Sequence, residues 1–261
     1  MTFETLLVDT DARGVAAVTL NRAEKHNALS PQMQADLTEA AQQLAADKTV
    51  RVVVLTGQGK TFCAGGDLEW MRTQTAATRE TRAEEARKLA RMLGAWNSLP
   101  KPVIGAVQGN AFGGGVGLAC ICDVAIGVET GKLGLTETRL GLIPATIGPY
   151  VVARMGEGRA RRVFMSSRLF SAAEAVDLGI LARVVPPDML AAAVEAEVAP
   201  YLHCAPGAVA MAKALALRLG ANVTAEDVDY SIAELITCWE QDDAREGVGA
   251  FFDKRKARWM R

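Results

Sequence analysis

The sequence predicts an α/β fold that gives way near residue 195 to a purely helical region. Two observations carry this prediction. Short runs of valine, leucine and isoleucine alternate with helix-like segments up to about residue 145, and the turns at the ends of these runs are rich in glycine. Beyond that point the strand signal fades, with a last strand expected at residues 182–185. We therefore expect a β/α core at residues 1–195, where ligands tend to bind at strand ends, and a helical region at residues 196–261.

Local signals place the individual elements. Leu6–Val8 and Val15–Leu20 predict two strands joined by a turn at Asp11–Gly14. Ser30 followed by Pro31 predicts a helix start, because the serine can accept from a free N–H group and proline gives up no N–H that the helix needs there. Apolar spacing, turn residues and a capping box predict the other elements. Strands are expected at Val50–Thr56, Val103–Val107, Val124–Val128 and Ala182–Val185, a loop at Gly57–Asp67 and a glycine-rich turn at Gly109–Gly115. Helices are expected from Leu68, over 80–98, over Val116–Cys122, from Ser171 (with Glu174 completing a capping box), over Gly207–Leu219 and over Thr224–Glu240.

Composition and charge exclude several classes of protein. The chain has 261 residues and a formal net charge of −1, so we expect no binding to nucleic acid and no attraction to an anionic membrane. It has no apolar run of membrane-spanning length and no visible signal peptide, which favours a cytoplasmic location. The five cysteines and two histidines lack the spacing of a metal site, so we expect reduced thiols and no metal.

Two glycine-rich turns are the first chemical features. Phe62–Asp67 (FCAGGD) and Gly109–Gly115 (GNAFGGG) each lead from a strand into a helix. Each turn can present backbone N–H groups at a helix N-terminus, and glycine permits close backbone approach. Two such turns facing each other predict an oxyanion hole, which holds one carbonyl oxygen between two N–H donors. The alternative is that both are merely tight turns; neither matches a dinucleotide fingerprint or a phosphate loop.

Glu137 is the candidate acid–base residue. It stands at the end of a short apolar strand that begins at Lys132. Its apolar flanks predict partial burial, which raises the pKa of a carboxyl group toward the range useful for acid–base catalysis. The alternative for a lone glutamate is a solvated surface position. The flanking residues are Leu133, Leu135, Leu140 and Leu142.

Taken together, these segments resemble the enoyl-CoA hydratase/isomerase (crotonase) family nearly from end to end. Each motif alone is weak, but their order is specific: Val18–Leu29 (VTLNRAEKHNAL), Val53–Gly57 (VVLTG), Phe62–Asp67, Pro100–Pro102, Gly113–Gly115, Cys122–Asp123, Glu137 and Phe251–Lys256 (FFDKRK). The resemblance implies a crotonase-like spiral of ββα units with a C-terminal helical part that mediates assembly into a homotrimer or a dimer of trimers. It also implies an acyl-CoA thioester substrate, with no cofactor beyond the coenzyme A that the substrate carries.

The resemblance further implies roles for individual residues. Ala64 and Gly114 would supply the N–H groups of the oxyanion hole, and Glu137 would be the acid–base residue. Coenzyme A would lie against the turn before the first long helix and along the first glycine turn, with further contacts from the tail of a neighbouring subunit. The implied substrate-binding residues are Lys25, His26, Ala28, Leu29, Ala64, Gly65, Gly66, Asp67, Leu68, Met71, Gly113, Gly117, Pro144, Phe251 and Lys254.

One position departs from the family's pattern. Hydratases of the best-known type have two catalytic glutamates, and the second would stand where this chain has Gly117. Glu137 alone would then serve as base and acid, provided that another group orients the water. The backbone near Ala145 and the hydroxyls of Thr146 and Tyr150 are candidates for that task.

The same departure favours a particular substrate. Gly117, Trp70–Arg72 (WMR) and Arg139–Tyr150 (RLGLIPATIGPY) look most like the bacterial methylglutaconyl-CoA hydratases of leucine breakdown. Their substrate has a distal carboxylate, so a glycine at position 117 would remove a negative charge and free space near it. Arg72 or Arg139 would be placed to pair with that carboxylate, unless both are surface or intersubunit groups.

Three other functions stay open. A generic short-chain enoyl-CoA hydratase would use the same site on a different acyl group. A Δ3,Δ2-enoyl-CoA isomerase needs only one glutamate, because it moves a proton between two carbons and activates no water. A non-catalytic CoA-binding member of the family would bind the thioester without turnover.

Overall fold

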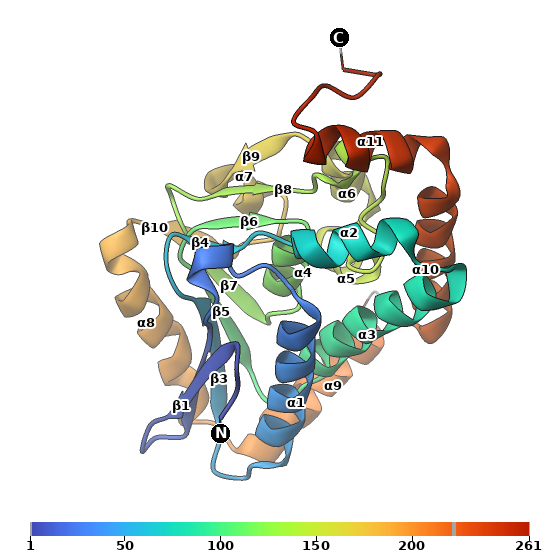
Figure 1. The fold of residues 1–261 in the computed structure, drawn as a ribbon. Coiled ribbons are helices and arrows are strands. Elements are labelled where there is room, and N and C mark those ends of the chain that lie inside the picture. Colours follow the sequence, from blue (N-terminus) through green and yellow to red (C-terminus); the bar gives the residue numbers. More distant parts are fainter. Residues whose placement is uncertain (1, 221–222, 261) are drawn as a thin grey trace.

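Two β-sheets form the centre of the molecule (Figure 1). The computed structural model describes residues 2–220 and 223–260. In spatial order, the larger sheet contains β1 (Leu6–Thr10), β2 (Val15–Leu20), β3 (Val52–Gly57), β5 (Val103–Val107), β7 (Val124–Val128) and β10 (Arg183–Val185), and the smaller contains β4 (Thr61–Cys63), β6 (Asn110–Phe112), β8 (Lys132–Gly134) and β9 (Leu169–Ser171). The β1–β2 and β8–β9 pairs are antiparallel, and the other pairs are parallel.

A repeated strand–strand–helix unit links the two sheets. β3 lies in the larger sheet, β4 lies in the smaller one, and α2 (Leu68–Ala76) follows; β5, β6 and α4 (Gly114–Cys120) repeat the pattern. β7 and β8 begin a third unit, which continues into the 3-10 helix η2 (Glu137–Leu140). Because β4, β6 and β8 are adjacent and parallel, the segments that follow them emerge at one edge of the smaller sheet. Both glycine turns and Glu137 therefore lie at this edge.

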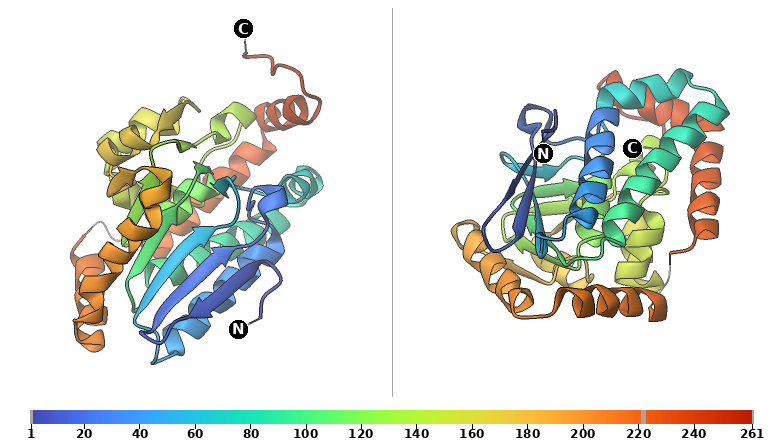
Figure 2. Two further views of the ribbon diagram at one scale, coloured as in Figure 1. Left: turned by 90° about the vertical axis from the view of Figure 1, so that its left-hand side faces the viewer. Right: turned by 90° about the horizontal axis from the view of Figure 1, so that it is seen from below.

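The larger sheet lies between helices on its two faces (Figure 2). Successive side chains of a strand point to opposite faces. Val53 and Leu55 therefore pack in the cluster formed with α1 (Pro31–Ala46) and α3 (Arg79–Asn97), whereas Val52 packs with α8 (Leu190–Leu202). Burial on both faces explains why these strands read as continuous apolar runs.

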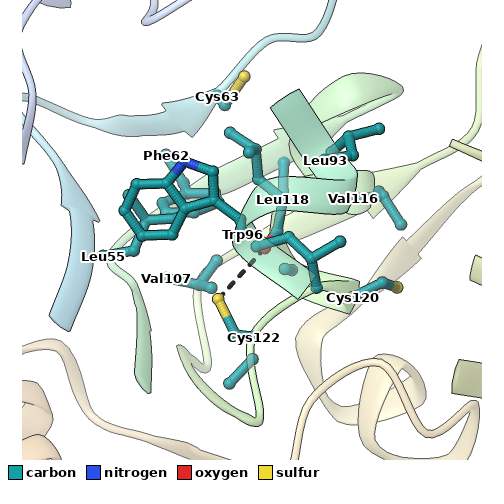
Figure 3. Close-up of a cluster of buried hydrophobic side chains, with 14 of the residues drawn as sticks. Leu55, Phe62, Cys63, Leu93, Trp96, Val107, Val116, Leu118, Cys120 and Cys122 are labelled. Carbon is teal, nitrogen blue, oxygen red and sulfur yellow. Dashed lines mark hydrogen bonds between the residues drawn. The ribbon is translucent and has the colours of Figure 1, made fainter. Parts of the chain in front are cut away.

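Trp96 lies at the centre of the main core (Figure 3). It is fully buried, and its indole N–H donates to the Leu37 carbonyl at 2.9 Å. The Cys122 thiol nearby donates to the Leu118 carbonyl at 3.2 Å. Burial raises the pKa of Cys122 to about 12, so this thiol is protonated at neutral pH. All five cysteines are free.

The C-terminal helices differ in how firmly they join the core. Ile232 and Ile236 of α10 (Ala225–Glu240) pack against alanines of α3. The last helix, α11 (Asp242–Phe252), lies against η2 so closely that a Cβ on Gly247 would be 2.4 Å from the Leu140 carbonyl carbon. In α9 (Pro206–Leu219), which the structure describes throughout, no residue is buried. The remaining helices are η1 (Ala23–Lys25), α5 (Gly148–Met155), α6 (Glu157–Phe164), α7 (Ala172–Asp177) and η3 (Pro187–Met189).

The α/β fold predicted from the sequence is confirmed, and the differences are local. β4 and β6 lie inside segments predicted as turns, and β9 was not predicted; three residues are too few for a strand pattern to show. Ser171 caps α7, but the Glu174 carboxylate binds Arg168 rather than completing the capping box. The expected boundary between residues 195 and 196 lies within α8, so the division into two regions stays a prediction.

Candidate active site

The two glycine turns and Glu137 meet where β4, β6 and β8 end. A Cβ on Gly65 would lie 3.3 Å from the Gly114 nitrogen, and a Cβ on Gly114 would lie 3.5 Å from the Gly65 Cα. A Cβ on Gly113 would lie 2.9 Å from Oε1 of Glu137. The parallel order of the three strands thus brings together all three features that the sequence singled out.

Close backbone approach explains why glycine occupies these positions. Gly65 has φ +91°, and a Cβ there would lie 2.8 Å from the Phe112 carbonyl oxygen. A Cβ on Gly115 would lie 2.2 Å from the Cys63 carbonyl oxygen. Either side chain would push the two turns apart, so glycine at these positions keeps the backbone amides of both turns close together.

The hydrogen bonds of the first turn correct the expected donor. The Ala64 N–H donates to the His26 carbonyl at 3.0 Å, so it is not free to bind a substrate oxygen. The Gly65 N–H contacts the Cys63 sulfur at 3.4 Å. The Gly66 N–H, by contrast, has no hydrogen-bond partner among the described residues. The residue pattern indicated the turn, but it gave no signal for which of the turn's N–H groups form hydrogen bonds within the folded protein.

The available N–H groups of the two turns lie side by side. Gly114 is the first residue of α4, where an N–H has no acceptor within the helix. The carbonyl carbon of Gly65, which is bonded to the Gly66 nitrogen, lies 3.8 Å from the Cβ position on Gly114. The pair of amides suited to one oxygen is therefore Gly66 and Gly114.

Glu137 has the environment of an acid–base residue. Its Oε2 atom is buried and, among the described residues, has no hydrogen-bond partner. Burial raises the pKa of Glu137 to about 7, against the opposing effects of its own N–H and that of Thr136. A carboxyl group with this pKa can take up or release a proton at neutral pH. A buried polar atom without a partner needs an explanation, and a polar substrate atom bound beside Glu137 would supply one.

Ile147 fills the space beside Gly117. A Cβ on Gly117 would lie only 2.5 Å from Cγ2 of Ile147 and 3.0 Å from its Cβ. The expectation that glycine frees space there is therefore wrong. An apolar side chain occupies the place, and Gly117 itself is buried.

The groups that the sequence suggested for orienting the water molecule differ in whether they already form hydrogen bonds within the protein. The Tyr150 hydroxyl donates to the Ala90 carbonyl at 3.3 Å and so faces α3. The Ala145 N–H donates to the Ile143 carbonyl at 2.8 Å. No hydrogen bond of the Thr146 hydroxyl to another described residue is present, although Thr146 is buried.

The predicted coenzyme A contacts form one continuous stretch beside the first turn. Two backbone hydrogen bonds join this stretch to the first turn: the His26 carbonyl accepts from the Ala64 N–H, and the Leu29 N–H donates to the Gly65 carbonyl. Lys25 is exposed and lies 3.5 Å from the Glu69 carboxylate. The other residues of this stretch and of the start of α2 are Ala28 and Asp67, both buried, Met71, partly buried, and Leu68, about half exposed.

The remaining predicted contacts lie farther along the chain. Pro144 lines a cavity of about 620 Å³ between α5 and α10. Phe251 is 46% exposed at the end of α11, and Lys254 follows it with φ +53°. α11 packs on η2 of its own chain. Contact of this tail with a neighbour's coenzyme A stays a prediction.

Two further properties concern the whole described chain. Over residues 2–220 and 223–260, no helix combines the length and the apolar character that crossing a membrane requires. The same residues contain no group of three or more His, Cys, Asp or Glu side chains placed to hold a metal ion.

Known proteins match this chain over nearly its whole length. The model of the enoyl-CoA hydratase/isomerase family matches residues 10–261. A putative enoyl-CoA hydratase of Thermus thermophilus is 36% identical over 255 residues, covering 97% of this chain and 100% of that protein. Crystal structures of enoyl-CoA hydratases from Mycobacterium smegmatis (36% identity, TM-score 0.80, 98% and 99% covered) and Mycobacterium avium (29% identity, TM-score 0.89, 99% and 100% covered) have the same fold. The chain belongs to the enoyl-CoA hydratase/isomerase family.

Proposed function

We propose that this protein adds water across the double bond of a 2-enoyl-CoA thioester, or removes it in the reverse reaction. The observation that carries the proposal is the unpartnered, buried Oε2 of Glu137 beside the free amides of Gly66 and Gly114. The relatives named enoyl-CoA hydratase support the same reaction class.

In this mechanism the two amides stabilise charge and Glu137 moves the proton. The thioester oxygen accepts from the Gly66 and Gly114 N–H groups and gains negative charge as the water oxygen bonds to the β-carbon. The Glu137 carboxylate takes the proton that this water loses, and the resulting carboxylic acid returns a proton to the α-carbon. Each amide donor is expected to stabilise the transition state by about 3–4 kcal/mol.

Replacing Glu137 tests this role. Glu137→Gln keeps the shape of the side chain but cannot accept the water's proton, so we expect loss of nearly all hydratase activity. The loss of the conjugated enoyl-CoA absorbance measures the rate, and circular dichroism checks that the variant is folded. Activity above a few per cent of wild type in a folded Glu137→Gln variant contradicts the assignment.

For the acyl group we propose a methylglutaconyl-type substrate. Two arginines support it: the Arg72 guanidinium lies 4.4 Å from the centre of the Phe252 ring, and Arg139 is exposed. Neither forms a salt bridge with another described residue. Either is thus available to a distal carboxylate. We expect a higher kcat/KM for methylglutaconyl-CoA than for crotonyl-CoA, and the opposite preference assigns a generic short-chain substrate.

Isomerisation of a 3-enoyl-CoA to a 2-enoyl-CoA is the second candidate. Ile147 favours it, because this apolar side chain fills the place of a second carboxylate and offers a water molecule no hydrogen bond. Glu137 would remove a proton from the α-carbon and return it to the γ-carbon, with the same two amides holding the enolate oxygen. Incubation with a 3-enoyl-CoA and with a 2-enoyl-CoA separates the two reactions: the isomerase forms conjugated product from the first and leaves the second unchanged.

We also propose a homotrimer or a dimer of trimers that works in the cytoplasm without a cofactor. Exposed apolar residues of α9 support an assembly surface, and these are Met211, Leu215 and Leu219. Light scattering of the full chain measures its mass, and undiminished activity after treatment with a metal chelator is expected. A monomer in solution contradicts the assembly.

A further inference from the structure

The peptide group between Gly65 and Gly66 is held from its carbonyl side. The Leu29 N–H donates to the Gly65 carbonyl oxygen at 2.8 Å. The C=O and N–H of a planar trans peptide point in opposite directions, so fixing the Gly65 carbonyl also fixes the direction of the Gly66 N–H. The same bond polarises the peptide and strengthens its N–H as a donor. The aim of the first amide of the site thus depends on where Leu29 lies.

Arg22 spans the two segments on either side of that bond. Its Nη1 donates to the Ala28 carbonyl at 2.9 Å and to Oδ2 of Asp67 at 3.0 Å. Ala28 directly precedes Leu29, and Asp67 directly follows Gly66. The Arg22 side chain is 18% exposed and that of Asp67 8%, so water competes little for these contacts.

The Asp67 carboxylate and the Arg22 backbone are themselves held by further hydrogen bonds. Oδ1 of Asp67 accepts from the N–H groups of Glu69 at 2.9 Å and Trp70 at 3.3 Å, which caps α2. Burial raises the pKa of Asp67, but Arg22 and these N–H groups lower it more, so it is a carboxylate at neutral pH. The Arg22 N–H donates to Oδ1 of fully buried Asn27 at 3.0 Å, which holds the arginine backbone in place.

We propose that Arg22 is a positioning residue for the oxyanion hole, whose guanidinium ties the Ala28 carbonyl to the Asp67 carboxylate and so aims the Gly66 N–H at the thioester oxygen. The inference rests on the proposed function and goes beyond it, because Arg22 acts through the Leu29–Gly65 hydrogen bond and not on the substrate. Loss of the bridge lets the two segments shift relative to each other. The Gly66 N–H then no longer points where the oxyanion forms.

The test compares Arg22→Met with a matched arginine elsewhere. Arg183 makes the same kind of bridge far from the site, to the Glu197 carboxylate at 2.7 Å and the Ala193 carbonyl at 3.1 Å. We expect Arg22→Met to lower kcat by about 10- to 100-fold, since displacement of a reacting group by about 1 Å can cost on the order of 100-fold. Arg183→Met is expected to leave kcat within about twofold of wild type while losing the same types of contact.

A spectroscopic readout separates aiming from general stability. Bound cinnamoyl-CoA, measured in the Glu137→Gln background to prevent turnover, should absorb at longer wavelength than the free thioester because the amides polarise its carbonyl. Arg22→Met should reduce this shift, and Arg183→Met should not. If Arg22→Met does not fold, Arg22→Gln takes its place, since its shorter, neutral side chain cannot hold the Ala28 carbonyl and the Asp67 carboxylate together as Nη1 of Arg22 does.

The outcomes distinguish the two proposals. An unchanged kcat, or a lower kcat with the full spectral shift, in folded Arg22→Met overturns the positioning role alone. If cinnamoyl-CoA binds to the Glu137→Gln parent without any shift, the oxyanion hole itself is absent, and the proposed function fails together with the inference. A reduced shift and a reduced kcat in Arg22→Met, with both unchanged in Arg183→Met, support the inference.

Discussion

Glycine serves opposite purposes in the two glycine turns and in α4. In the turns, Gly65 and Gly114 let two stretches of backbone meet and leave amides unpaired. In α4, Gly117 lets the side chain of Ile147 fill the space completely. The turns form a polar side that is open to an oxygen atom, whereas Gly117 and Ile147 form an apolar side that is closed. The group that lies where each glycine lacks a Cβ, more than the glycine itself, therefore decides what the site can do.

The largest effect is expected on the polar side. In Gly65→Ala the new Cβ would lie 2.8 Å from the Phe112 carbonyl oxygen, at a φ of +91° that alanine rarely adopts. The turn must shift, so the Gly66 and Gly114 amides separate and one donor is lost. We expect kcat to fall by at least ~100-fold, because one oxyanion donor contributes about 3–4 kcal/mol. Steady-state hydration of an enoyl-CoA measures this.

Gly158→Ala is the control for the added methyl group. Gly158 lies in α6 with no atom within 4 Å of its Cβ position. We expect unchanged activity and a slightly higher unfolding free energy, because alanine favours a helix over glycine by up to about 1 kcal/mol. Equal activities of the two variants would show that the approach of the turns has no role in catalysis.

Sequence and structure agree on which segments meet more than on which N–H groups stay free. The glycine turns and Glu137 were predictable because each has a residue signature and because ββα units bring their strand ends together. The Ala64 amide was the wrong donor, since hydrogen bonds between segments far apart in sequence decide which N–H stays free. The place of Ile147 was hidden for the same reason: 30 positions separate it from Gly117 along the sequence. Arg22 carries no local pattern that points to the first turn.

Burial of the Glu137 carboxyl group lowers the stability of the folded protein when the group is ionised. Burial raises its pKa from 4.5 to about 7, so the folded protein binds more protons than the unfolded chain between these pH values. Its stability relative to a variant without this group therefore falls as pH rises through that window, by roughly 3 kcal/mol in total. Glu137→Gln cannot ionise and escapes this loss. We therefore compare the unfolding free energy of Glu137→Gln with that of wild type. The difference, variant minus wild type, is expected to be about 3 kcal/mol larger at pH 8.5 than at pH 4.

Urea unfolding of both proteins at several pH values measures the difference, in which all other titrating groups cancel. The two stability curves should run in parallel below about pH 4.5, diverge up to about pH 7 and run in parallel again above it. Curves that stay parallel throughout would mean that the carboxyl group is well solvated, and the site would lose its acid–base residue.

The smallest effect is expected on the apolar side. In Gly117→Ala the new Cβ would lie 2.5 Å from Cγ2 of Ile147, and overpacking of this kind costs about 1–3 kcal/mol of unfolding free energy. Ile147→Ala removes Cγ2, so the double variant should be more stable than the sum of the two single losses predicts, by about 1–2 kcal/mol. Ile147→Val retains Cγ2 and should give no such relief. If Ile147→Val reduces the stability loss of Gly117→Ala as much as Ile147→Ala does, the contact with Cγ2 of Ile147 is not what closes the space beside Gly117. Relief by alanine alone would show that Cγ2 of Ile147 fills the space beside Gly117.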